Sequence, residues 1–195
     1  MFCPEVGSII SVMRDKDYRI LDSGGLNLVG IRMARAATNV FDDTFVVFRA
    51  GMGGSVWTAE FFPCTTDAGY YHLEHGLRKG TAILAPGQYV DAYCIGLHQG
   101  KYEALVQDGP VTVFRDNNKD HELDYTSPET GMFGINIHRA NPNISSKQVD
   151  KWSAGCTVIA SPADFKRLMT LAQEHVSAGH GKRFSYTLLE RRDFK

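Results

Sequence analysis

Two residues whose side chains can do nucleophilic chemistry together, His138 and Cys156, lie in the C-terminal part of the chain with residues 139–155 between them. An imidazole that takes the proton of a nearby thiol turns that thiol into a nucleophile at neutral pH. Cys156 follows the small residues Ser153-Ala154-Gly155, which allow backbone N–H groups to approach a reacting carbonyl oxygen, as an oxyanion hole requires. The pattern therefore predicts a Cys-His active site, with a buried structural cysteine as the commoner alternative.

The segment that carries His138 has the alternation of a β-strand. Residues 134–138 read Gly-Ile-Asn-Ile-His, and the side chains of a strand point alternately to its two faces. Ile135 and Ile137 would then enter the core, and Asn136 and His138 would share the other face. This arrangement suits a histidine that has to reach a cleft, and it makes Asn136 a candidate for contact with a substrate.

Most of the chain alternates apolar and polar residues in short runs that end at glycines, which predicts a β-rich α+β protein. One main helix is expected in the C-terminal half, with Ser161 as N-cap, Pro162 in its first turn and Gly179 beyond its end. The glycine-rich segment 50–55 is expected to be a hairpin loop. The segments expected to be strands are 26–33, 44–49, 56–62, 81–84, 92–97, 104–107, 111–115, 134–138 and 184–190.

The composition is that of an ordinary globular protein. The 195 residues are 43% hydrophobic and 22% charged, and a chain of this length can bury a proper core, most simply as a single domain over residues 1–195. A net charge of −1 and the lack of a basic run disfavour nucleic acid as a partner. No stretch approaches the roughly 20 apolar residues that span a bilayer, so no membrane insertion is expected.

The N-terminal sequence lacks the pattern of a secretory signal, since its apolar stretch 8–13 is short and has no basic flank before it or small-residue cleavage site after it. We therefore expect synthesis in the cytoplasm without a signal peptide. Cys3, Cys64, Cys94 and Cys156 form no CxxC pair, so neither a zinc site nor a disulfide framework is indicated. Cys64 and Cys94, both in apolar stretches, are expected to be buried free thiols.

The spacing of His138 and Cys156, together with the Ser-Ala-Gly-Cys turn, resembles the catalytic motif of the L,D-transpeptidases, the YkuD-type cysteine enzymes of peptidoglycan. Softer similarities in residues 65–71 and 79–100 resemble a divergent branch that is common in phages and gut bacteria. The resemblance covers roughly residues 26–190. It implies an L,D-transpeptidase-like β-sandwich or barrel with one main helix in the C-terminal half.

The resemblance also implies a role for each matching residue. Cys156 would attack the carbonyl of a donor stem peptide, at the bond between an L-configured centre and a D-alanine, and His138 would take the thiol proton and pass it to the leaving amine. Backbone N–H groups near Gly155 and Cys156 would hold the oxyanion. The backbone carbonyl of Arg139 would orient His138. No cofactor is implied.

Further residues beside the motif are candidates for substrate contact. The Arg139 side chain can bind a stem-peptide carboxylate with two hydrogen bonds, or it can be a solvated loop arginine. Ser153 fits either the site or a hydrogen bond within its own turn. Trp152 fits a wall of the cleft or the core. His98, in a loop with glycines on either side, fits substrate contact or a hydrogen-bonded structural role.

The polar segment 116–124 matches a calcium-binding loop only in part. Asp116, Asn118, Asp120 and Asp124 provide oxygen atoms at positions 1, 3, 5 and 9 of such a loop. The glycine at its sixth position and its final glutamate are missing. A polar hairpin loop is the favoured interpretation, calcium is the alternative, and no metal is assigned.

The chain departs from the family pattern at Arg139, Ala154 and Val158, where the family has a glycine or serine, a histidine and a polar residue. Because Ala154 and Val158 remove polar groups from the side of the acyl acceptor, the sequence favours hydrolysis over transfer. We expect a cysteine enzyme of peptidoglycan stem peptides, an L,D-carboxypeptidase, endopeptidase or transpeptidase, that reaches the bacterial cell wall through phage lysis or dedicated delivery. The alternatives are a non-catalytic β-rich binding or virion structural module and a Cys-His peptidase of another substrate class.

Overall fold

The computed structural model describes residues 1–34, 39–51, 56–76 and 79–194. Most of the glycine-rich segment that was expected to be a hairpin loop, residues 52–55, lies outside the described residues. Within them the chain forms eleven strands and three α-helices, which confirms a β-rich α+β protein.

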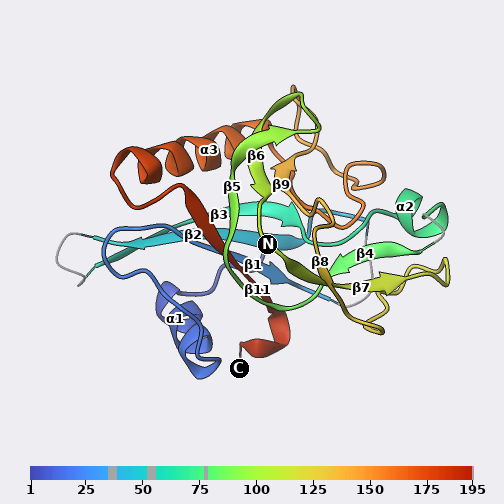
Figure 1. The fold of residues 1–195 in the computed structure, drawn as a ribbon, viewed down its shortest axis with the longest axis horizontal. Coiled ribbons are helices and arrows are strands. Elements are labelled where there is room, and N and C mark those ends of the chain that lie inside the picture. The colour runs from blue at the N-terminus through green and yellow to red at the C-terminus, as the bar shows by residue number, and fades with distance from the viewer. Residues whose placement is uncertain (35–38, 52–55, 77–78, 195) are drawn as a thin grey trace.

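The strands of the described residues form two sheets. Their bounds, in chain order, are β1 (Asn27–Arg32), β2 (Asp43–Ala50), β3 (Trp57–Thr65), β4 (Thr81–Leu84), β5 (Gly87–His98), β6 (Tyr102–Gln107), β7 (Val111–Asp116), β8 (Glu129–Gly131), β9 (Ile137–Arg139), β10 (Thr157–Ile159) and β11 (Arg183–Glu190). A closed barrel has the order β1, β11, β5, β6, β9, β10, β3 and β2, and β4, β7 and β8 form a separate sheet (Figure 1). The barrel contains both the strand that carries His138 and the strand that follows Cys156.

The connection between His138 and Cys156 returns the chain to the same place in the barrel. β9 and β10 are parallel neighbours, with Ile137 opposite Thr157 and His138 opposite Val158. Two parallel strands need a crossover connection of a dozen or more residues, and residues 140–156 supply it. The seventeen residues between the histidine and the cysteine are therefore what lets the two lie close together.

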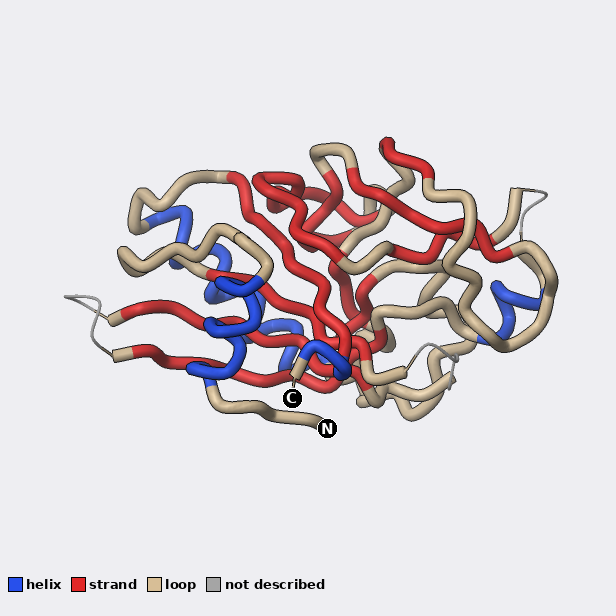
Figure 2. Tube along the Cα trace, turned by 90° about the horizontal axis from the view of Figure 1, so that it is seen from below, coloured by secondary structure: helices blue, strands red, loops and turns tan. Residues whose placement is uncertain are grey.

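The predicted helix is present and a further, N-terminal helix was not predicted. In α3 (Pro162–Ser177) the Ser161 hydroxyl accepts the Asp164 N–H at 3.4 Å, as expected of an N-cap. The helix α1 (Val6–Asp15) covers the outside of the barrel, where its residue Ile9 is buried with residues of β1 and β2. Figure 2 shows the helices at the periphery of the strands. None of the helices in the described residues is long and apolar enough to cross a membrane.

The strand predicted over residues 134–138 is wrong in its first half. Only Ile137–Arg139 pairs as β9, and Gly134 has a φ of +72°. The reason is a side chain that competes for the backbone, since Gln107 Oε1 accepts the N–H groups of both Phe133 and Ile135 at 3.0 Å. Those N–H groups are thereby unavailable to a strand ladder.

The expected burial of the two free thiols holds for one of them. Cys64 on β3 is fully buried, whereas Cys94 on β5 is only partly buried. Tyr93, next to Cys94, points into the core, and alternation along the strand places Cys94 on the outer face.

A buried arginine joins the barrel to the smaller sheet. Arg32, at the end of β1, is 1% exposed and pairs with Asp67 at 2.9 Å. Its guanidinium also donates to the carbonyl oxygen of Leu84 on β4 at 3.0 Å and to the Tyr125 hydroxyl at 2.8 Å. The second carboxylate nearby, that of Asp43, accepts the Thr66 N–H and hydroxyl. Burial raises the pKa of both carboxyl groups, and the charge of Arg32 opposes that shift.

We expect Arg32→Leu to lower the free energy of unfolding by about 3–5 kcal/mol, because it leaves buried carboxylates without their cation. Urea denaturation measures the difference. Arg19→Leu is the matched control, since Arg19 forms an exposed ion pair with Asp91 at 3.1 Å, and the loss there should stay below about 1 kcal/mol. Equal losses in the two variants would contradict a structural role for the buried arginine.

Candidate functional site

The ring of His138 is held in the orientation of a general base. The side chain is 4% exposed, and Nδ1 lies 2.8 Å from the carbonyl oxygen of Arg139. A carbonyl can only accept, so Nδ1 carries the proton and Nε2 keeps a free electron pair. Burial lowers the pKa of His138 to about 4, with the neighbouring His98 as the second cause. The imidazole is therefore neutral at pH 7 and has an unprotonated Nε2, and its lowered pKa makes that nitrogen a weaker base than a free imidazole.

His98 packs on this ring, and Asn136 is bonded to His98. The His98 ring stacks on that of His138 with centroids 4.0 Å apart. The Asn136 amide donates from Nδ2 to His98 Nδ1 at 3.0 Å, and its Oδ1 accepts the Gln107 N–H at 2.9 Å. Burial lowers the pKa of His98 as well. These hydrogen bonds fit the structural role considered for His98, and substrate contact by His98 or Asn136 stays a prediction.

Tyr102 belongs to the site although the sequence did not single it out. Its hydroxyl donates to the carbonyl oxygen of Arg139 at 3.3 Å and lies 3.4 Å from His138 Nδ1. The Arg139 guanidinium lies over the Tyr102 ring at 4.1 Å from its centroid. Tyr102 opens β6, which adjoins β9 in the barrel. No local motif surrounds it, so only the barrel order brings it to His138.

The turn before Cys156 is built by Ser153 and Gly155. The Ser153 hydroxyl donates to the carbonyl oxygen of Cys156 at 2.8 Å and accepts the Gly155 N–H at 3.1 Å. Ser153 is fully buried, so it has the local turn role and not a substrate contact. Gly155 has a φ of +114°, and a Cβ there would lie 1.8 Å from the carbonyl oxygen of Ala82. Only glycine fits between the turn and β4.

The oxyanion donors differ from those expected. Because the Gly155 N–H is already bonded to Ser153 Oγ, it is not free to bind a substrate oxygen. Within the described part of the chain no group accepts the N–H of Cys156 itself. The predicted oxyanion hole is corrected accordingly, with Cys156 N–H as the available donor and Gly155 as the residue that allows the turn.

Cys156 lies at the end of its turn, directly before β10, and contacts the segment that leads into β9. The Cys156 thiol donates to the carbonyl oxygen of Gly134 at 3.4 Å, and its sulfur accepts the Asn136 N–H at 3.4 Å. Both Cys156 and His138 are among the described residues, and no hydrogen bond joins them.

Burial raises the pKa of the Cys156 thiol to about 11, although the Asn136 N–H opposes the shift. With His138 neutral as well, the resting site holds a thiol and an imidazole and not a thiolate–imidazolium pair. Proton transfer then requires the thiol to turn from Gly134 toward His138. The arrangement can perform general-base-assisted attack by sulfur, with the proton leaving as the bond forms.

Trp152 and Arg139 are both open to solvent. Trp152 is 39% exposed, so it does not belong to the core. Arg139 is half-buried, and no carboxylate of the described residues lies within ion-pair distance of its guanidinium. The positive charge of Arg139 contributes to lowering the pKa of His98 and the pKa of His138. The Arg139 side chain therefore lies near the base and is available to an anionic group.

The polar loop after β7 uses its oxygen atoms internally. Asp116 Oδ2 accepts the Asp124 N–H at 3.3 Å, Asn118 Oδ1 accepts the Asp120 N–H at 3.1 Å, and Asp120 Oδ1 accepts the Glu122 N–H at 2.8 Å. Burial raises the pKa of Asp116 to about 6. No group of three or more His, Cys, Asp or Glu side chains in the described ranges is arranged to hold a metal ion.

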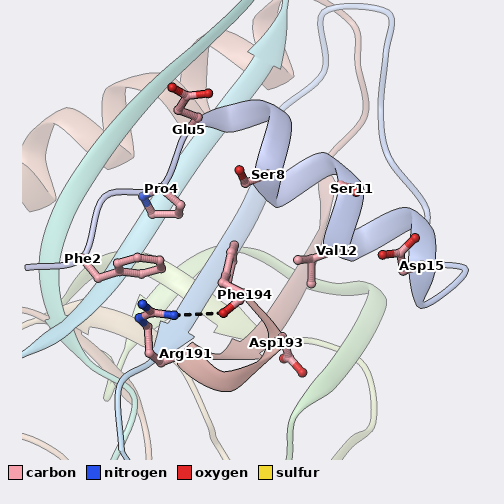
Figure 3. A pocket seen from close by; sticks show the side chains of 10 residues that line it. All are labelled: Phe2, Pro4, Glu5, Ser8, Ser11, Val12, Asp15, Arg191, Asp193 and Phe194. Atoms are coloured by element: carbon pink, nitrogen blue, oxygen red, sulfur yellow. Dashed lines mark hydrogen bonds between the residues drawn. The ribbon is translucent and has the colours of Figure 1, made fainter.

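A hollow of about 420 Å³ lies away from this site, between α1 and the C-terminal 3₁₀ turn Arg191–Asp193. Figure 3 shows Arg191 bonded to the carbonyl oxygen of Phe194 at its edge, at 3.1 Å. None of the candidate site residues lines it. Its lining consists of Phe2, Pro4, Glu5, Ser8, Ser11, Val12, Asp15, Arg191, Asp193 and Phe194.

We expect alkylation of Cys156 by iodoacetamide to accelerate about tenfold per pH unit between pH 7 and 10, because a thiol with a pKa of about 11 gains thiolate in that proportion. Peptide mapping by mass spectrometry gives the rate at Cys156, in a variant with Cys3→Ser and Cys94→Ser. A rate that is already constant below pH 6 would instead show a preformed thiolate–imidazolium pair.

Comparison of the chain with protein families, with curated proteins and with solved structures finds no match in any of the three.

Proposed function

We propose that this protein is a cysteine enzyme of the L,D-transpeptidase type that cleaves peptidoglycan stem peptides. The observation that carries the proposal is the orientation of His138, whose Nδ1 is bonded to the Arg139 carbonyl oxygen while Nε2 is left as a base. Cys156 directly precedes β10, the strand that pairs with β9, and this proximity supports the proposal. The stacked ring of His98 and the Tyr102 hydroxyl, 3.4 Å from Nδ1, hold the His138 ring in this orientation.

The reaction follows from these positions. Cys156 Sγ attacks the carbonyl carbon of the scissile amide while its proton passes to His138 Nε2, and the carbonyl oxygen becomes an oxyanion near Cys156 N–H. The C–N bond then breaks and the proton moves from Nε2 to the leaving amine. Water, deprotonated by the same nitrogen, releases the acyl group from sulfur as a carboxylate and restores the thiol. An amine in place of water would give transfer.

Hydrolysis is favoured by the surroundings of the thioester. Val158, opposite His138 in the strand pair, is fully buried and apolar, and Ala154 provides no polar side chain. A second amine substrate would therefore find few partners. The Arg139 guanidinium, which lies over the Tyr102 ring and forms no ion pair with a carboxylate of the described residues, suits a carboxylate of the stem peptide.

The proposal is tested with purified protein and bacterial sacculi. We expect new muropeptides that lack the terminal D-alanine, detected by mass spectrometry after muramidase digestion, and none with Cys156→Ala, which lacks the nucleophile. Cys94→Ser is the matched control and should retain full activity. Unchanged muropeptides from sacculi of several chemotypes would contradict the proposal and favour a non-catalytic binding or virion structural module.

Arg139 provides a second test, of substrate charge. If its guanidinium binds a terminal carboxylate, a stem tetrapeptide should be cleaved with a kcat/KM at least about tenfold above that of its C-terminal amide, since a charge-assisted hydrogen bond contributes about 1.5–3 kcal/mol. Arg139→Gln should abolish this preference, mainly through KM. A preference that survives the substitution would mean that Arg139 is a solvated residue.

A further inference from the structure

A second hollow, of about 560 Å³, lies beside the turn that carries the cysteine. One wall is the short helix α2 (Tyr70–Glu74), and the other is the segment Asp150–Trp152. Trp152 is 39% exposed and Tyr71 is 40% exposed, and both line this hollow. The lining is mainly apolar, with charged groups at its edge. We call it the aromatic groove, and its lining residues are Tyr70, Tyr71, Glu74, Asp150, Lys151 and Trp152.

The two walls of the aromatic groove are tied together at their base. Asn39 Oδ1 accepts the N–H groups of Tyr70 at 3.2 Å and of Asp150 at 2.8 Å, and Asn39 Nδ2 donates to the Asp150 carboxylate at 2.7 Å. The Gly69 N–H donates to the Ser153 carbonyl oxygen at 2.9 Å. A Cβ on Gly69 would lie 2.1 Å from the Asp150 carbonyl oxygen. The groove is therefore preformed, and a ligand need not organise it.

The charged side chains that line the aromatic groove indicate which class of ligand it can bind. The ammonium of Lys151 lies over the Tyr71 ring, 4.3 Å from the centroid. It already fills the position over the ring that a cationic ligand would take. The carboxylates of Glu74 and Asp150 disfavour an anion. A neutral ligand with an apolar face for Trp152 fits these charges, and its hydroxyl groups can donate to the remaining lone pairs of Glu74 and Asp150, whose carboxylates also accept from His121 at 2.8 Å and Asn39 at 2.7 Å. Sugar rings have an apolar face, whose C–H groups pack on an aromatic ring, and they also have hydroxyl groups.

We propose that the aromatic groove binds a saccharide chain, and specifically N-acetylated amino sugars of the peptidoglycan glycan strand. The choice of amino sugar rests on the proposed function, whereas the saccharide class follows from the groove. Trp152 precedes Cys156 by four residues, which limits the separation of their Cα atoms to about 14 Å. A glycan in the groove would keep its attached stem peptides within reach of the thiol. The groove volume lies within the range of small-molecule sites.

The test uses the chain's two tryptophans, Trp57 and Trp152. In a Trp57→Phe variant the indole fluorescence reports only on Trp152, and titration with the β-1,4-linked tetramer of N-acetylglucosamine should shift it saturably. Calorimetry with the same tetramer should show binding at least tenfold weaker in Trp152→Ala and in Tyr71→Ala. Ile144→Ala is the matched control, since Ile144 is 66% exposed and outside the groove, and it should bind as the unaltered chain does.

The outcomes separate this inference from the proposed enzyme activity. Cys156→Ala should bind the tetramer with an unchanged Kd, because the groove does not include the thiol. Saturable binding of choline chloride in place of the tetramer would overturn the saccharide assignment in favour of a cation site. Absence of any fluorescence shift up to tens of millimolar tetramer would overturn it outright, whether or not stem peptides are cleaved.

Discussion

The buried guanidinium of Arg32 is the interaction on which the arrangement of the site depends. Arg32 ends the first barrel strand, and its hydrogen bond to Leu84 fixes the end of β4. Two residues earlier on β4, the carbonyl oxygen of Ala82 lies so close to Gly155 that no side chain fits between them. The position of the cysteine turn is thus set by a charged group in the barrel wall. A buried ion pair contributes little net stability but is costly to break, so it fixes one arrangement of the two sheets.

Desolvation shapes the chemistry that the site can perform. Burial moves the pKa of His138 down to about 4 and that of Cys156 up to about 11, so both groups are neutral over the whole physiological range. A neutral pair is less reactive toward oxidants and adventitious electrophiles than a thiolate. In the proposed reaction sulfur would have to lose its proton during attack, so the orientation of the imidazole would be decisive. His98, Asn136 and Tyr102 fix that orientation through stacking and hydrogen bonds.

The aromatic groove and the thiol share one short segment of chain. Asp150–Trp152 forms a wall of the groove, and the Ser153 turn that follows presents Cys156. Asn39 and Gly69 hold this segment from the other side, and Asp150 has a φ of +38°. A non-glycine residue in that conformation stores strain that persists only where the surroundings enforce it. The segment therefore holds the wall of the aromatic groove and the Cys156 turn in one fixed relation.

The sequence by itself determined the β-rich class and the helix capped by Ser161, because these depend on local periodicity and on residue types. It did not determine the first half of the 134–138 segment, where the distant Gln107 takes the backbone N–H groups. Nor did it determine the roles of Tyr102, Asn136 and Gly155, which are set by contacts with β6, His98 and β4. Such contacts join residues far apart in the chain, so only the closure of the barrel and the packing of the second sheet decided them.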